Sequence, residues 1–163
     1  MAVLPLRFVP DPVLRQKTKR IPGMDSGLER LIDDMLETLP EVNGVGLAAP
    51  QVGASVRLAV IAMPDEEPMV LINPEIVKRS GLREVTEACL SIPGYAGEIK
   101  RAKSVTVKAR NIEGKEFRVK ATGLLAQALE HEVDHLEGTL YIDHVETADG
   151  LYRVEHREEK DLL

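Results

Sequence analysis

Four short β-type runs between two helical segments constrain the fold of this chain most strongly. The runs span residues 56–61, 70–72, 105–109 and 117–119, and the last two flank a turn at residues 111–114. The spacings between the runs indicate no helical crossovers of the kind that parallel strands require, so we expect antiparallel pairing. The expected fold class is α+β, with antiparallel strands packed around a central helix.

Two segments carry apolar residues at helical spacing. The first is expected to begin at Ser26, which has capping-box spacing to Glu29, and to end at Pro40. The second is expected to follow an N-cap at Thr122 and to stop near Gly138. The apolar residues of the first helix are Leu28, Leu31, Ile32, Met35, Leu36 and Leu39, and those of the second are Leu124, Leu125, Ala128, Leu129 and Leu136.

Composition places the chain among ordinary globular proteins. Its 163 residues are 44% hydrophobic and 29% charged, and no repeat or Gly/Ser linker divides them. We therefore expect one domain over residues 1–163, with no structure assigned to the charged tail at 146–163. The net charge of -6 argues against a basic face for nucleic acids. The lone cysteine and the absence of a long apolar run predict a cytoplasmic protein without membrane contact.

The second helix contains a pattern that is typical of metal sites. His131 and His135 are four residues apart, so both imidazoles lie on one helix face and can bind the same ion. Glu132 lies beside them and could reach a water on that ion, as a general base must. The alternative is a helix surface that happens to carry two histidines.

A catalytic metal site usually has three protein ligands and one open position. Cys89, the only thiol, is the natural third candidate, and it lies in a stretch at residues 86–94 that we expect to be loop-like. An inert buried cysteine is the alternative. A further segment, residues 44–53, combines small residues with one polar side chain, Gln51, and no Gly-Lys-Ser/Thr follows it, which argues against a phosphate loop. A structural turn is the alternative there.

Together these three segments resemble the three signature motifs of the peptide deformylase family, in the same order and with similar separations. Gly-x-Gly-x-Ala-Ala-x-Gln matches residues 44–51, and His-Glu-x-x-His matches residues 131–135. The middle motif, usually Glu-Gly-Cys-Leu-Ser, has Ala88 in place of glycine, and Glu130 stands where the family most often has Gln. The resemblance extends over residues 3–145 and does not include the tail.

The resemblance implies a metal-dependent hydrolase that removes the formyl group from the N-terminal formyl-methionine of nascent polypeptides. It implies Cys89, His131 and His135 as metal ligands and Glu132 as the general base. It also implies that the Gln51 side chain and the Leu90 N–H stabilise the oxyanion. Residues that match family positions for substrate binding or for holding the site are Val45, Gly46, Val85, Glu87, Arg101, Leu124, Ala128 and His131.

Some of these matches have plain structural alternatives. Core packing would explain Val45, Val85 and Leu124 equally well, and an exposed ion pair would explain Glu87 and Arg101. The implied cofactor is one divalent metal ion per chain, Fe²⁺ in cells, with Zn²⁺, Ni²⁺ or Co²⁺ as alternatives. The implied partners are formyl-methionyl nascent peptides and the exit region of the ribosome.

Three rival hypotheses remain at the level of sequence. A zinc peptidase would share His-Glu-x-x-His but take a third ligand downstream, from Glu137, Asp143, His144, Glu146 or His156. A thiol hydrolase would use Cys89 as its nucleophile. A non-catalytic relative would bind a nascent chain or a ribosome without hydrolysis, and Glu132 and Gln51 argue against it because a binder needs neither a base nor an oxyanion donor.

Overall fold

The computed structural model describes residues 2–154. Helix α1 spans Ser26–Glu41 and helix α2 spans Gly123–Leu136. The strands are β1 (Gly46–Ala48), β2 (Leu58–Ile61), β3 (Met69–Ser80), β4 (Arg83–Cys89), β5 (Ile92–Arg101), β6 (Ser104–Arg110), β7 (Glu116–Thr122) and β8 (Leu151–Arg153). Short 3₁₀ segments are η1 (Pro12–Arg15), η2 (Ala49–Val52), η3 (Tyr141–His144) and η4 (Ala148–Gly150).

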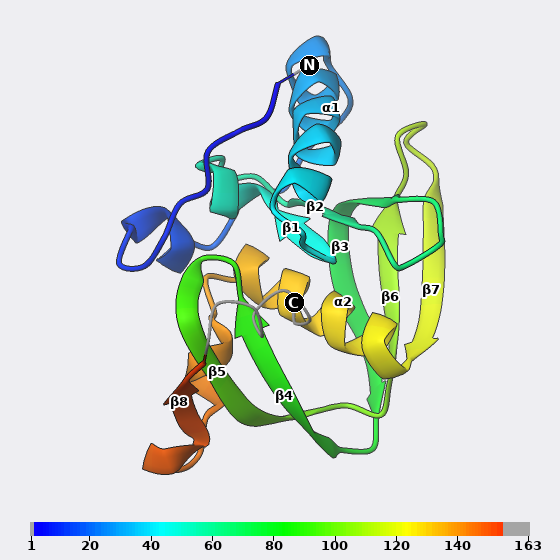
Figure 1. The fold of residues 1–163 in the computed structure, drawn as a ribbon. Helices are drawn as coiled ribbons and strands as arrows, with labels where there is room; N and C mark the ends of the chain where they lie inside the picture. The colour runs from blue at the N-terminus through cyan, green and yellow to red at the C-terminus, as the bar shows by residue number, and fades with distance from the viewer. Residues whose placement is uncertain (1, 155–163) are drawn as a thin grey trace.

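The strands form two sheets with α2 between them (Figure 1). One sheet has the order β1-β2-β3-β6-β7 and the other has the order β4-β5-β8. Every strand pair in both sheets is antiparallel. This arrangement confirms the expected α+β class with a central helix.

Apolar packing places α2 against the larger sheet. Leu129 of α2 is fully buried in one cluster with Leu71 of β3 and Val107 of β6. Helix α1 packs against other side chains of the same sheet, because its Met35 lies in a second cluster with Leu58 of β2. Burial of such side chains is the main favourable term in folding. No helix within residues 2–154 is long and apolar enough to cross a membrane.

The two helices begin and end close to their expected boundaries. Asp25, rather than Ser26, caps α1, since its Oδ1 accepts a hydrogen bond from the N–H of Leu28 at 2.8 Å. Pro40 lies inside the last turn and the helix ends one residue later. Thr122 is the N-cap of α2, as predicted, although its side chain makes no capping hydrogen bond. The chain leaves α2 through Gly138, whose φ of 76° favours glycine.

The sheets contain more strand than the sequence pattern predicted. The interval between residues 72 and 105 holds β4 and β5, so the expectation that residues 86–94 form a loop was wrong. Cys89 ends β4 and pairs with Ile92 of β5 across a tight hairpin. These strands carry many charged residues, which conceal the usual alternation. In the tail, β8 pairs with β5, while residues 155–163 lie outside the described residues.

Candidate metal centre

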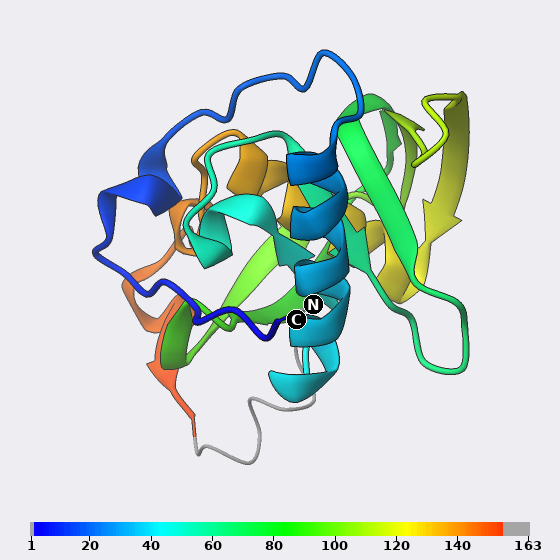
Figure 2. The same ribbon diagram turned by 90° about the horizontal axis from the view of Figure 1, so that it is seen from above.

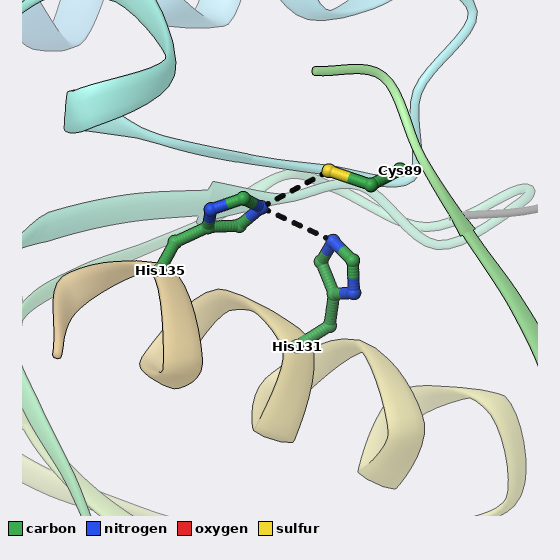
Figure 3. A group of neighbouring side chains, drawn as sticks. All are labelled: Cys89, His131 and His135. Atoms are coloured by element: carbon green, nitrogen blue, oxygen red, sulfur yellow. Dashed lines mark hydrogen bonds between the residues drawn. The ribbon is translucent and has the colours of Figure 1, made fainter. Parts of the chain in front are cut away.

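Two imidazoles and one thiol converge on a single point beside α2 (Figure 3). The ligating atoms of Cys89, His131 and His135 lie within 4.8 Å of one another, and all three residues are buried. His135 Nε2 lies 3.3 Å from Cys89 Sγ and 3.2 Å from His131 Nε2. Ligands at about 2.0 to 2.3 Å from a tetrahedral ion would lie roughly 3.3 to 3.8 Å apart. The spacing and the donor chemistry therefore fit one divalent transition-metal ion.

A buried ion pair orients the first histidine. Glu87 Oε2 lies 2.6 Å from His131 Nδ1, so Nδ1–H donates to the carboxylate and Nε2 is left for a metal. Arg101 donates to both oxygens of Glu87, from Nε at 3.0 Å and from Nη2 at 2.5 Å. Burial alone would raise the pKa of Glu87, but His131 and Arg101 lower it to about 2. Both partners are buried, so the alternative of an exposed ion pair was wrong.

Glu132 lies on the same helix in a dry environment. Its side chain is 1% exposed, and its Oε1 has no hydrogen-bond partner among the described residues. Burial raises the pKa of Glu132 to about 7. Gly46 of β1 lies directly against it, because a Cβ at that position would be 2.8 Å from Glu132 Cδ. The missing side chain of Gly46 thus makes room for the carboxyl group.

Gln51 approaches the same point from the short helix η2. Its side chain is 2% exposed, and its Nε2 lies 3.1 Å from Ser91 Oγ and 3.8 Å from Cys89 Sγ. Leu90 lies between Cys89 and Ser91 at the hairpin turn, and its Cδ1 would be 2.8 Å from a Cβ at Gly44. Gly44 and Gly46 therefore permit close contact with Leu90 and Glu132 of the metal-binding segments.

The remaining predicted residues differ in burial and in the cluster that they join. Ala128 is fully buried, and the partly buried Val45 packs against the same cluster. Val85 packs against the cluster that contains Cys89, while Leu124 in the first turn of α2 is 43% exposed. Glu87 was predicted to bind substrate, but it is fully buried and bonded to His131 and Arg101, which favours a supporting role.

The two departures from the family pattern are accommodated locally. Glu130 is 5% exposed, and its carboxylate accepts from Arg79 Nε at 2.8 Å and from the N–H of Ala102 at 3.1 Å. A charge at this position is therefore paired. Ala88 is buried at the register shift of the β4–β5 ladder.

Sequence reasoning assigned no role to Asp134 or Ser91. Asp134 Oδ2 accepts from Arg101 Nη1 at 2.8 Å and so joins the network behind His131. Its position directly before His135 was the available signal. Ser91 was also visible, as the last residue of the middle motif.

The alternative third ligands lie elsewhere. His156 is outside the described residues, and the other four each pair with a side chain that does not belong to the cluster. These pairs are Glu137 with Arg57, Asp143 with Arg15, His144 with Asp134, and Glu146 with Lys100. The geometry therefore favours Cys89 over the downstream residues that a zinc peptidase would use.

Comparison with known proteins agrees with this geometry. The family described as polypeptide deformylase matches residues 3–150. The chain belongs to this family. A peptide deformylase from Dehalococcoides mccartyi strain CBDB1 is 55% identical over 155 residues, which cover 94% of this chain and 93% of the relative.

Solved structures of peptide deformylases also resemble this fold. The enzyme from Legionella pneumophila has a TM-score of 0.87 and 41% identity, covering 98% of this chain and 94% of its own. The enzyme from Synechococcus elongatus, crystallised with actinonin, has a TM-score of 0.86 and 40% identity, covering 98% of this chain and 87% of its own. The similarity therefore extends over nearly the whole chain.

Proposed function

We propose that this chain is a metal-dependent hydrolase that removes the N-terminal formyl group from the formyl-methionine of nascent polypeptides and releases formate. The observation that carries the proposal is the convergence of Cys89, His131 and His135 beside the buried Glu132, in a chain of the polypeptide deformylase family. Gln51 reaches the same point from a different segment. A metal site used only for structure would need neither a base nor an amide donor.

Each side chain then has a chemical role. A divalent ion held by Cys89, His131 and His135 would acidify a water molecule and polarise the formyl carbonyl. Glu132 accepts the proton of the attacking water and passes it to the leaving amine, and its raised pKa suits both transfers near neutral pH. Gln51 Nε2 and the N–H of Leu90 donate to the oxygen that becomes negative in the transition state.

Glu87 and Arg101 support this chemistry from behind the ligands. Their ion pair fixes the tautomer of His131, which keeps Nε2 free for the metal. We assign the methionine side chain of the substrate to the lining that the family resemblance implies, which consists of Val45, Val85, Leu124, Ala128 and His131. An apolar lining of this kind suits an unbranched thioether.

Several finer assignments belong to the same proposal. The resident ion is Fe²⁺ in cells, and the thiolate and imidazole donors also suit Zn²⁺, Ni²⁺ or Co²⁺. Residues 1–163 form one catalytic domain, which acts in the cytoplasm on nascent chains at the exit region of the ribosome. Its acidic net charge argues against direct binding of nucleic acid.

The direct test is an activity measurement on anaerobically purified protein. Bound metal is quantified, and release of formate is followed from formyl-Met-Ala. We expect about one divalent ion per chain and formate release that stops on chelation and returns on addition of Fe²⁺. Met-Ala without the formyl group is the control, and cleavage of its peptide bond would favour a peptidase instead. Fully metallated protein that releases no formate would contradict the proposal.

Cys89 offers an independent test of ligation because it is the only thiol in the chain. A metal-bound sulfur is already deprotonated and engaged, so a thiol reagent should react slowly until a chelator removes the ion. A nucleophilic cysteine would react rapidly in the untreated protein, and an inert buried one would resist the reagent in both states. Circular dichroism after chelation checks that the fold survives metal removal. Rapid labelling of fully metallated protein would exclude Cys89 as a ligand.

A further inference from the structure

The hydroxyl of Ser91 is a buried polar group that the proposed chemistry has not used. Ser91 is 0% exposed, and its Oγ accepts a hydrogen bond from Gln51 Nε2 at 3.1 Å. It lies two residues after Cys89, in the hairpin turn directly before β5. Loss of one partner of a buried hydrogen bond leaves the other partner unsatisfied and lowers stability. We therefore asked what the Ser91 hydroxyl does for Gln51.

The orientation of the Gln51 amide follows from its neighbours. The N–H of Ala48 points at one end of the amide at 3.0 Å, and because an N–H must donate, that end is Oε1. Nε2 therefore faces the hairpin. Of its two hydrogens, one is directed at Ser91 Oγ, and the other is left for the side where Cys89 Sγ lies at 3.8 Å. That side contains the candidate metal ligands.

The backbones of both residues are tied to the same N-terminal segment. The N–H of Arg7 donates to the carbonyl oxygen of Gln51 at 2.7 Å, and the N–H of Val9 donates to the carbonyl oxygen of Ser91 at 3.0 Å. The segment thus joins η2 to the β4–β5 turn, although Gln51 and Ser91 are 40 residues apart in the sequence. Because both backbones are held, the Ser91 hydroxyl stays within reach of the Gln51 side chain.

We propose that Ser91 is a positioning residue that acts through Gln51. Its hydroxyl takes one amide hydrogen, so the second hydrogen is held toward the formyl oxygen of the substrate. This inference rests on the proposed function, in which Gln51 stabilises the oxyanion. The terminal torsion of a glutamine is soft, and without the hydroxyl the amide can rotate away from the productive direction. Preorganised donors are effective because they need no reorganisation during the reaction.

The kinetic test compares Ser91→Ala with the wild type and with Gln51→Leu. We expect Ser91→Ala to lower kcat by about 10-fold with little change in KM, as loss of one hydrogen bond predicts. Ser91→Thr retains the hydroxyl and should recover most of kcat. In a Gln51→Leu background, Ser91→Ala should have almost no further effect, because the group that it positions is gone. Equal effects of Ser91→Ala in both backgrounds would overturn the inference.

The matched control is Thr38→Val on α1. Thr38 is also 0% exposed, and its hydroxyl donates to the carbonyl oxygen of Asp34 at 2.6 Å and accepts from the N–H of Leu4 at 2.8 Å, so both partners lie outside the three motifs. This variant should lose stability without any loss of kcat. A similar fall in kcat for Thr38→Val and Ser91→Ala would show a general effect of lost stability, and would contradict a positioning role.

A second measurement does not depend on activity. In zinc-loaded protein, the side-chain amide signals of Gln51 are identified by NMR from their loss in Gln51→Leu. We expect Ser91→Ala to shift these signals and to speed their exchange with water, and Ser91→Thr to leave both nearly unchanged. Unaltered Gln51 signals in Ser91→Ala would overturn the inference, even if the wild-type protein released formate normally. A wild type without formate release would contradict the proposed function, while the NMR result would still decide whether Ser91 holds Gln51.

Discussion

The two α-helices are similar in length but are buried in different ways. Helix α1 has 16 residues and lies on the outside of the molecule (Figure 2). Helix α2 has 14 residues and runs between the two sheets. The buried residues of α1 are Leu28, Ile32, Met35, Thr38 and Leu39, whereas those of α2 are Ala126, Gln127, Ala128, Leu129, Glu130, His131, Glu132, Val133, His135 and Leu136.

The two helices differ in the kind of side chain that they bury. A helix such as α1 gains free energy simply by removing apolar surface from water. Helix α2 also removes ionisable groups from water, and each of these needs a partner or changes its protonation state. Glu130 has Arg79, and His131 has Glu87 with Arg101 behind it. Glu132 Oε1 has no partner within the described residues, which is the condition expected of a base.

The sharpest test of this contrast is Glu132→Ala. The substitution removes the proposed proton acceptor but no metal ligand, so activity should fall by about 10²-fold or more, while metal content stays near one per chain. Formate release and metal analysis of the same sample give both values. Asp33→Ala, an exposed acid on α1, is the control and should retain wild-type activity. A Glu132→Ala enzyme with most of its activity would show that the base lies elsewhere.

Breaking the buried ion pair between Glu87 and Arg101 should cost the most stability. Arg101→Met leaves the fully buried Glu87 without its cation, and loss of one partner of a buried pair costs about 4 kcal/mol. His131 would also lose its fixed orientation, so metal affinity should fall. The free energy of unfolding by urea and a metal competition titration measure the two effects. A change below about 1 kcal/mol would show that Glu87 does not depend on Arg101.

The corresponding change on α1 should affect stability alone. Met35 is fully buried in an apolar cluster, and Met35→Ala should destabilise the fold by about 3 kcal/mol through lost contacts and a cavity. Within residues 2–154, the hydrogen-bond partners of the Cys89, His131 and His135 side chains all lie outside α1. The values of kcat and metal affinity should therefore remain those of the wild type at temperatures where the variant is folded. A fall in kcat that exceeds the fall in folded fraction would contradict the separation of roles.

The same contrast explains what the sequence could predict. In α1 the spacing of Leu28, Ile32 and Met35 is a local signal, and only the cap was misplaced, because Asp25 and Ser26 are both good capping residues. In α2 the spacing of His131 and His135 was also a local signal in the sequence. Cys89 was a candidate ligand because it is the only thiol, but the resemblance assigned both Cys89 and Gln51 to the site, since their positions depend on how the sheets pack.

Other features could not be inferred from local pattern. Strands β4 and β5 were missed because residues such as Arg83 and Lys100 interrupt the apolar alternation, while Glu87 is polar yet fully buried. The partner that makes its burial tolerable, Arg101, is 14 residues away. The hairpin pairs Glu87 with Gly97, and the long side chain of Arg101 reaches from the same strand to the Glu87 carboxylate. Burial of a charge is therefore a property of the folded pair and not of either residue alone.

The smallest expected effect concerns a charge at the edge of this network. His144 Nε2 lies 2.9 Å from Asp134 Oδ2, and the hydrogen bond with Asp134 raises the pKa of His144 above its usual value, against the opposing charge of Arg101. A raised pKa in the folded state means that protonated His144 stabilises the fold. This contribution is complete below the unfolded pKa of about 6.5 and is lost as pH rises through the higher folded value. His144→Asn should therefore lower the Tm by a few degrees or less near pH 5.5, and the difference from wild type should shrink above neutrality. Thermal unfolding of metal-loaded protein across this range measures the effect, and Arg30→Gln on the exposed side of α1 should show no such pH dependence. A wild-type advantage that grows with rising pH would contradict the assigned direction of the shift.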